Sequence, residues 1–302
     1  MIMRIGYLST IYHTSFILKN NPSKQLKDYQ LEWNLYPTGP AMIRAFKKGD
    51  IDVGYVGLPP AMIGIDNGLK LKCVAGGHVE GTVMIAPSPY HTYDVTGSTK
   101  AVLNQFEGES IGTPSRGSIH DIIIRDMVQE FDIEIINYTW ADFIPDAIEE
   151  GEIAAGVGTP SLATTAQQQL NARIVLPPYK LWPYNPSYGI LVEEDLTREN
   201  QDFLLNFLKA HEVASELIRK EPEIAAEIVH REIGVVDKEF ILNTYNISPR
   251  YCASLPDAYI NSTLKFIPTL QDLGYLEDGL KRDDVFQTEF IEEIHPEKPH
   301  YY

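Results

Sequence analysis

The sequence predicts an α/β fold made of two lobes, and three observations support this prediction. The chain has 302 residues, about twice the usual size of a single domain. Short apolar segments alternate with helical segments through the first two thirds, which is typical of strands in largely parallel sheets. One segment also recurs, because residues 45–61 and 147–163 share the same order of helix, glycine, short strand and proline-opened helix.

The first unit alternates strands and helices from the N-terminus to a polar break at residues 87–98. Short apolar runs bounded by turn residues predict its strands, which we expect at 2–8, 31–36, 51–56, 71–76 and 83–86. Helices are expected at 13–19, 40–48 and 59–66. In the second of these, Met42, Ile43 and Phe46 share one face, as in a helix that packs on a sheet.

The second unit repeats this alternation. We expect its strands at 110–112, 133–138, 153–157 and 173–176, and its helices at 118–131, 141–149 and 160–168. A proline-rich break at 177–186 leads to a strand at 188–192, which we expect to return to the first unit. The remainder is predicted to be helical, with Phe203, Phe207 and Ala210 on one stripe. The first lobe should therefore comprise residues 1–88 and 189–302, and the second lobe residues 89–188.

The repeat predicts where a ligand would bind. In each copy a strand ends near a glycine, Gly57 or Gly158, and a proline, Pro59 or Pro160, opens the next helix. Ligands of open α/β sheets bind outside the carboxyl ends of the strands. Crossings near 87–98 and 177–188 would turn these loops toward each other, so we expect a ligand cleft between the lobes.

Composition excludes several classes of protein. The net charge is −17, and no basic stripe is present that could bind a nucleic acid. Cys73 and Cys252 are too far apart for a disulfide framework or a metal knuckle. No apolar run is long enough for a transmembrane helix. The chain starts directly in a strand pattern, so we expect no export signal within it.

The acidic excess is unevenly distributed along the chain. Most of it follows Glu193, and we expect the chemistry in the more neutral part before it.

A small-residue loop at 112–118 follows one predicted strand and opens a helix. Ser115 and Ser118 can accept hydrogen bonds from the first turn of that helix. Its free N–H groups and the positive end of its macrodipole favour an anion, although a plain helix cap is the alternative. Arg116 is the one cation of these loops. It would neutralise a sulfonate or a carboxylate, unless it is an exposed surface arginine.

These segments together resemble a known family. The runs Gly49-Asp-Ile-Asp-Val-Gly54 and Gly117-Ser-Ile-His120, with Ile5-Gly-Tyr7 and Leu71-Lys-Cys-Val-Ala-Gly76, resemble solute-binding proteins of ABC importers. The group in question handles nitrate, taurine, aliphatic sulfonates and thiamine-pyrimidine precursors. The resemblance covers residues 4 to about 275. It implies a two-lobed periplasmic-binding-protein fold of type II, with a ligand cleft between lobes that close by a hinge.

The resemblance also implies ligand contacts at matching positions. These are Ser9, Thr10, Ile11, Tyr12 and His13 after the first strand, Thr38 and Gly39, Gly57, Leu58 and Pro59, then Ser115, Arg116, Gly117, Ser118 and His120, and finally Trp140, Gly158, Thr159 and Pro160. The aromatic side chains of Trp182 and Tyr184, in the second crossing, either contact the ligand or only wall the cleft.

We therefore expect a monomeric solute-binding protein, not an enzyme, that captures a small anionic organic molecule without a cofactor. The resemblance implies an ABC permease as partner and a periplasmic or membrane-tethered location. The alternative is a cytoplasmic enzyme on the same scaffold, of the thiamine-pyrimidine or menaquinone-pathway type. The missing export signal favours it, whereas the cysteine-rich motif of the pyrimidine synthase is not present in the sequence.

Overall fold

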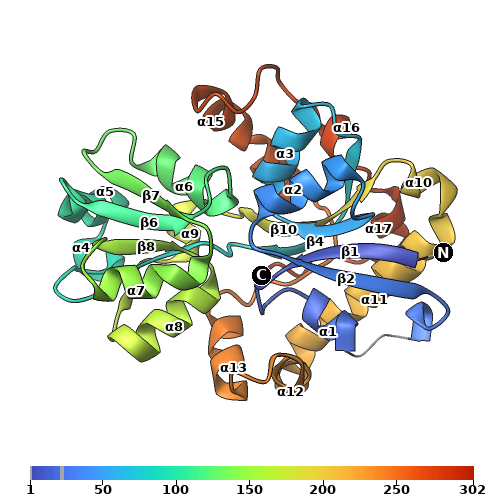
Figure 1. Ribbon diagram of the computed structural model, residues 1–302, viewed down its shortest axis with the longest axis horizontal. Helices are drawn as coiled ribbons and strands as arrows, with labels where there is room; N and C mark the ends of the chain where they lie inside the picture. Colours follow the sequence, from blue (N-terminus) through green and yellow to red (C-terminus); the bar gives the residue numbers. More distant parts are fainter. Residues whose placement is uncertain (1, 21–23) are drawn as a thin grey trace.

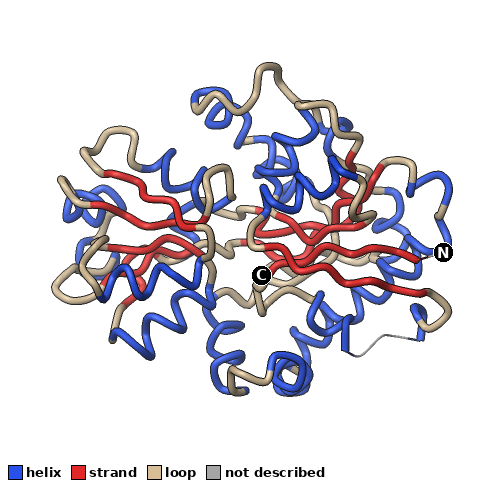
Figure 2. Tube along the Cα trace, viewed as in Figure 1, coloured by secondary structure: helices blue, strands red, loops and turns tan. Residues whose placement is uncertain are grey.

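The computed structural model describes residues 2–20 and 24–302, and they form two five-stranded sheets that lie side by side (Figures 1 and 2). Residues 1 and 21–23, which belong to the expected first lobe, lie outside the described residues. The predicted two-lobed α/β architecture is confirmed, and the two copies of the sequence repeat contribute to different sheets.

The first sheet has the strand order β2-β1-β3-β10-β4. Its strands are β2 (Gln30–Tyr36), β1 (Ile2–Leu8), β3 (Val53–Val56), β10 (Pro186–Glu193) and β4 (Leu71–Val79). β1 runs parallel to β2 and β3, whereas β10 is antiparallel to both of its neighbours. Every residue of β3 is buried, as expected for a strand covered on both faces. The edge strand β2 has no buried residue.

Helices cover both faces of this sheet. α2 (Gly39–Lys48) and α3 (Leu58–Asp66) lie on one face, and α1 (Ser15–Asn20) and α11 (Gln201–Lys220) lie on the other (Figure 1). The apolar stripe predicted for residues 203–214 explains the position of α11. Phe203, Phe207, Ala210 and Ala214 are all buried, so the stripe faces the core.

The second sheet has the order β7-β6-β8-β5-β9. Its strands are β7 (Glu134–Tyr138), β6 (Ser110–Pro114), β8 (Ala155–Gly158), β5 (Val83–Ala86) and β9 (Arg173–Leu176). α6 (Ile119–Met127) covers one face, and α7 (Ile144–Glu149) and α8 (Pro160–Leu170) cover the other (Figure 1). The shorter helices of this lobe are α4 (Tyr93–Thr96), α5 (Thr99–Leu103) and α9 (Pro178–Leu181).

The first crossing between the sheets lies earlier than expected. β5 pairs antiparallel with β8 and β9, so the assignment of residues 83–86 to the first lobe is wrong. The chain crosses at Glu80–Thr82, three buried residues without proline, and the polar break at 87–98 lies within the second lobe. Glu80 has φ of 61° and is followed by Gly81, so the chain turns sharply here. In the sequence this short segment without proline looks like an ordinary link between two apolar strands, and the crossing is not recognisable from it.

Two helix boundaries also differ from the expectation. Residues Ala141–Phe143 form a 3₁₀ turn, and α7 begins only at Ile144. Pro145 explains this start, because proline is favoured in the first turn of a helix and disfavoured further inside. α6 ends at Met127, four residues before the expected end.

The C-terminal third is helical, as expected, and contacts both lobes. Its helices are α10 (Leu196–Glu199), α11, α12 (Pro222–Ile233), α13 (Lys238–Ile247), α14 (Asp257–Leu264), α15 (Phe266–Asp272), α16 (Arg282–Val285) and α17 (Glu289–Ile294). α13 packs on α8 of the second lobe, where Thr244 Oγ1 and Thr164 Oγ1 are 3.0 Å apart. No helix within residues 2–20 and 24–302 combines the length and apolarity needed to cross a bilayer.

Candidate functional site

A cavity of about 570 Å³ lies between the two sheets. Its lining comes from the loops that follow β1, β2 and β3 in the first sheet and β6, β7 and β8 in the second. These six loops are at the carboxyl ends of parallel strands, where α/β proteins place their ligands. The volume is also within the range of small-molecule sites. The cavity is therefore the candidate ligand site.

Many of the residues expected to contact ligand line this cavity: Ser9, Thr10, Ile11, Tyr12, His13, Thr38, Gly39, Gly57, Ser118, His120 and Thr159. The structure thus brings together residues from loops up to 150 positions apart in the sequence. Their contact with a ligand stays a prediction. The remaining residues lie outside the lining: Leu58, Pro59, Ser115, Arg116, Gly117, Trp140, Gly158 and Pro160.

The outlying positions have local explanations. Leu58 is fully buried in the core, and Pro60 lines the cavity in place of Pro59. Arg116 is exposed, and its Nε donates a hydrogen bond to the Tyr275 hydroxyl at 3.0 Å. Of the two roles expected for Arg116, its position fits that of an exposed surface residue and not that of a ligand contact in the cavity.

The aromatic residues of the second crossing also lie away from the cavity lining. The Trp182 ring stacks on Phe266, with ring centroids 4.0 Å apart and an interplanar angle of 7°. Tyr184 packs edge-on against Tyr301 at 5.6 Å. Both side chains therefore join this crossing to the C-terminal third of the chain, and neither of them forms part of the cavity wall.

The start of α6 is a capped helix N-terminus with an acidic side chain beside it. Ser118 Oγ accepts from the backbone N–H of Asp121 at 3.3 Å. The Asp121 carboxylate is fully buried and accepts from the N–H of Gly117 and from Arg125, each at 2.8 Å. Asp121 thereby occupies one free N–H and offsets the positive end of this macrodipole. The serine loop is a weaker anion site than the sequence indicates.

Two buried histidines line the cavity, and both are neutral near pH 7. Burial lowers the pKa of His120 to about 4, and its Nδ1 lies 2.9 Å from Thr82 Oγ1. Burial likewise lowers the pKa of His13 well below its ordinary value. The His13 ring packs against Tyr188 at 3.9 Å between centroids, and its Nδ1 has no hydrogen-bond partner among the described residues. His13 thus lines the cavity with one buried nitrogen left without a protein partner.

The charged side chains of the lining are acidic. Asp142 and Asp146, from the loop after β7 and the start of α7, are both exposed and line the cavity. Among the described residues that form the wall, there is no lysine or arginine. Donors for an acceptor group can therefore come from the starts of α2, α3, α6 and α8, from hydroxyls, from the Gln169 amide and from the two histidines.

One wall was missed by the sequence analysis. Ile233, Val235, Val236 and Phe240, around the turn between α12 and α13, line the cavity. This wall lies after Glu193, outside the part of the chain in which the sequence places the chemistry. The pair Val235-Val236 between Gly234 and Asp237 was a usable signal in the sequence, because apolar side chains in a turn are exposed unless a partner covers them. In the structure Val235 is 87% exposed.

A group of three side chains that could bind a metal lies elsewhere in the described chain. It comprises Cys252, His295 and His300, and none of them lines the cavity.

Comparison with known proteins agrees with this architecture. The model of the NMT1-like family matches residues 2–233. No curated protein matches the chain.

Solved structures of similar fold include the periplasmic aliphatic sulphonate binding protein SsuA from Escherichia coli, with a TM-score of 0.78 and 17% identity over 96% of this chain and 99% of that one. The periplasmic nitrate-binding protein NrtA from Synechocystis PCC 6803 has a TM-score of 0.77 and 14% identity over 97% and 88%. The ligand-binding component of an ABC-type import system from Staphylococcus aureus, solved with zinc bound, has a TM-score of 0.79 and 15% identity over 98% and 100%. These likenesses concern the fold.

Proposed function

The chain belongs to the NMT1-like family, and from this premise we propose that it is a solute-binding protein of an ABC importer that captures a small organic molecule between its lobes. One observation carries the proposal: a single cavity is lined by six strand ends, three from each sheet. A ligand held by both lobes favours the closed arrangement, because it gains contacts there that neither lobe offers alone.

The ligand proposed here carries a hydrogen-bond acceptor or an anionic group at one end and a donor or cationic group at the other. Four helices, α2, α3, α6 and α8, begin at the cavity, and helix starts favour acceptors and anions. Asp142 and Asp146 favour the opposite charge at their part of the wall. The proposed ligand thus has the anionic group expected from the sequence and, in addition, a donor or cationic group.

The two moving bodies are proposed to be residues 2–79 with 186–302, and residues 83–181. The crossings Glu80–Thr82 and 182–185 would form the hinge. Gly81 in the first crossing packs closely on β10, because an added Cβ there would lie 2.0 Å from Ser187 Oγ. Tyr12 Oη and Ser187 Oγ, 2.7 Å apart, fix the first sheet next to this crossing.

The proposed partner is the permease of the importer, and the proposed place of action is outside the cytoplasmic membrane. Two of the structural neighbours are periplasmic proteins.

A ligand screen by thermal unfolding tests the proposal. The panel comprises nitrate, alkanesulfonates, aminoalkanesulfonates, small carboxylates, amino acids and pyrimidines. A ligand present at a hundred times its dissociation constant stabilises the folded state by about 2.7 kcal/mol, which corresponds to a shift of roughly 5–10 °C for a chain of this size. We expect zwitterions or compounds with a separate donor group to give larger shifts than the corresponding simple anions.

Recovery of the compound separates binding from catalysis. Mass spectrometry after incubation should return the hit unchanged. A hit that is consumed would indicate the enzyme alternative, and the absence of any shift across the panel would contradict the proposed ligand class. Stabilisation by simple anions alone would remove the proposed role of Asp142 and Asp146.

A further inference from the structure

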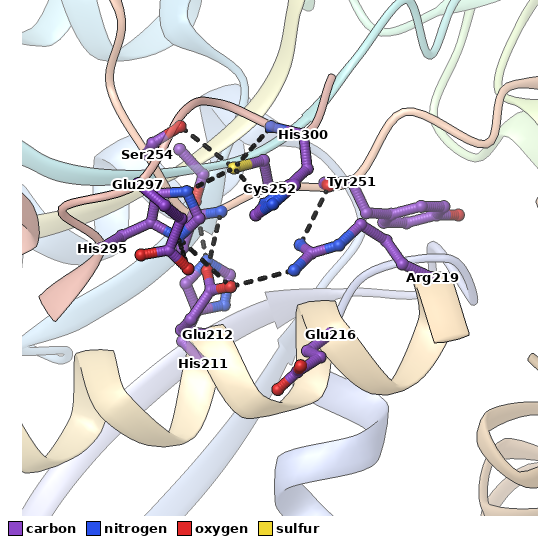
Figure 3. A network of polar contacts seen from close by, with 12 residues as sticks. His211, Glu212, Glu216, Arg219, Tyr251, Cys252, Ser254, His295, Glu297 and His300 are labelled. Carbon is purple, nitrogen blue, oxygen red and sulfur yellow. Dashed lines mark hydrogen bonds and ion pairs between the residues drawn. The ribbon is translucent and has the colours of Figure 1, made fainter. Parts of the chain in front are cut away.

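Three side chains of the types that bind metals meet in the C-terminal part of the chain (Figure 3), and none of them lines the cavity. Cys252 lies after the β-bridge residue Tyr251, His295 follows α17, and His300 lies in the segment after it. The Cys252 sulfur and one ring nitrogen from each histidine all lie within 4.8 Å of one another. Cys252 and His295 are buried, and His300 is half-buried.

The distances within this group match those between the ligands of a zinc ion. His295 Nε2 lies 3.6 Å from Cys252 Sγ, and His300 Nδ1 lies 3.9 Å from it. In a tetrahedral site with Zn–S of about 2.3 Å and Zn–N of about 2.05 Å, sulfur and nitrogen ligands are about 3.6 Å apart. Both sulfur-to-nitrogen distances are therefore within a few tenths of an ångström of those in a zinc site, and the two histidine nitrogens lie within 4.8 Å of each other.

The surroundings orient these side chains as in zinc sites. His295 Nδ1, its other ring nitrogen, lies 3.3 Å from Glu212 Oε1, an ion-pair distance without the angle of a hydrogen bond. Glu212 is held in turn by Arg219 Nη2 at 3.1 Å and by the N–H of Ala253 at 3.3 Å. A carboxylate behind a coordinating histidine fixes the ring orientation in many zinc sites. The backbone N–H of His300 donates to Cys252 Sγ at 3.3 Å, as expected beside a thiolate.

The sequence spacing is compatible as well. Four residues separate His295 from His300, within the three to five that are typical between histidine ligands of zinc. The spacing of the two cysteines gives no sign of this group, because the histidines that join Cys252 lie 43 and 48 positions further along the chain.

We propose that Cys252, His295 and His300 bind one Zn²⁺ ion, with a fourth position open to water or another exchangeable ligand. A thiolate with two imidazoles is a donor set that zinc prefers over magnesium or calcium. The site is independent of the proposed solute binding, because its ligands lie outside the cavity lining.

Zinc at this position would bind the C-terminal segment that carries His300 to the first lobe, next to the proposed hinge. The segment that carries His300 continues to Tyr301, whose hydroxyl donates to the carbonyl groups of Cys252 and Ser254 at 2.5 and 2.9 Å. Tyr301 also contacts Tyr184 in the second crossing. The metal would thus link residues 251–254 to the C-terminal segment at one point, beside Glu212 of α11.

Zinc titration of the full chain tests this site. The protein is stripped with a chelator under reducing conditions and titrated with Zn²⁺ in competition with a chromophoric chelator, then with Co²⁺ as a spectroscopic probe. We expect one tight equivalent per chain, a tetrahedral Co²⁺ spectrum and a thiolate-to-cobalt charge-transfer band. Cys252→Ser, His295→Gln and His300→Gln should each lose the tight equivalent. Glu212→Gln should lower zinc affinity by about 10- to 100-fold.

Matched controls separate this site from other zinc ligands. Cys73→Ala removes the other cysteine, which is buried in β4, and His91→Gln removes an exposed histidine. Both should bind zinc like the wild type. Thermal unfolding of the metal-free proteins shows which variants fold. His300→Gln is the decisive variant if Cys252→Ser does not fold, since His300 is only half-buried.

Three results would overturn the proposal. The wild type could retain no zinc against the chelator, or folded His300→Gln could bind zinc as tightly as the wild type. The tight equivalent could also be lost in His120→Asn while it persists in His300→Gln, which would place the metal in the cleft.

Discussion

His13 combines a structural contact with a place in the cavity wall. Its ring packs on Tyr188 and lines the cavity, and its buried Nδ1 has no partner among the described residues. The packing explains why the ring keeps one orientation, and the ring nitrogens are the groups through which it would bind a solute. The sequence pointed to the loop from Ser9 to His13, but it could not indicate which atom of the loop faces the cavity.

Replacement of His13 by phenylalanine tests this division of roles. Phenylalanine keeps the aromatic contact with Tyr188 and removes the ring nitrogens. We expect affinity for the ligand found by the screen to fall about tenfold, the value of one hydrogen bond, while the melting temperature of the free protein changes little. Calorimetry measures the affinity. Unchanged affinity in a folded variant would show that His13 is only a packing residue.

His120 should make the folded state sensitive to acid. Its pKa is about 4 in the folded protein, because of burial, and 6.5 ordinarily. Between pH 6.5 and about 4, the His120 imidazole is protonated in the unfolded chain but stays neutral in the folded protein. The stability contributed by neutral His120 is therefore complete above pH 6.5 and is lost as the pH falls to about 4, on the order of 1 kcal/mol per pH unit.

The variant His120→Gln should lose less stability on acidification than the wild type. Urea unfolding at pH 7.5, 5.5 and 4.5 measures the difference, and the exposed His91→Gln serves as the control. His13 and His78 are also buried with lowered pKa values, so part of the acid sensitivity should remain. Identical pH profiles for the wild type and His120→Gln would contradict the expected effect.

At the scale of elements, local patterns predicted what lies within one segment and missed what depends on pairing. The strands that precede Gly57 and Gly158 and the helices opened by Pro59 and Pro160 were predictable from composition and turn residues. The sheet to which β5 belongs was not, because four apolar residues pair equally well with either sheet. Only the partners β8 and β9 decide it.

The turn between α12 and α13 should contribute to ligand affinity. Val235 lines the cavity and is 87% exposed, so Val235→Asp should change the free energy of unfolding by no more than about 0.5 kcal/mol. A carboxylate in this wall would lie unpaired beside a bound solute, and we expect at least about tenfold weaker binding of an anionic or apolar ligand.

The control for this variant is Val95→Asp, which alters an equally apolar residue that is 66% exposed on α4 and outside the cavity lining. Equal affinities for Val235→Asp and Val95→Asp, measured by calorimetry, would exclude the turn from the site.

At the scale of the whole molecule, the sequence predicted the two lobes and a cleft between them, because the repeat and the two sheets follow from the same chain pattern. The cavity wall that the C-terminal third contributes could not be predicted from the sequence. α13 reaches the second lobe through Thr244 and Thr164, two threonines 80 positions apart with no local signal. The exclusion of Arg116 from the cavity depends likewise on Tyr275, a distant residue that accepts its hydrogen bond.

The contact between Gly57 and Ile119 provides a test of lobe closure. Gly57 follows β3 of the first sheet and Ile119 begins α6 of the second lobe. An added Cβ at Gly57 would lie 3.3 Å from the Ile119 side chain. The φ of Gly57 is −62°, so its backbone accepts any residue, and a larger side chain acts mainly by filling the space between the lobes, since the nearest atom of its own lobe is the Ser187 carbonyl oxygen at 3.4 Å. Gly57→Leu should therefore hold the lobes apart while each lobe keeps its own core.

Small-angle X-ray scattering should give a larger radius of gyration for Gly57→Leu than for the wild type with ligand, and calorimetry should detect no binding. Gly279→Leu is the matched control, because nothing lies within 4 Å of a Cβ added there. It should scatter and bind like the wild type. If Gly57→Leu kept both the compact scattering profile and the affinity, closure of α6 on the loop after β3 would not be needed for binding. The cavity would then have to hold its ligand mainly from one lobe.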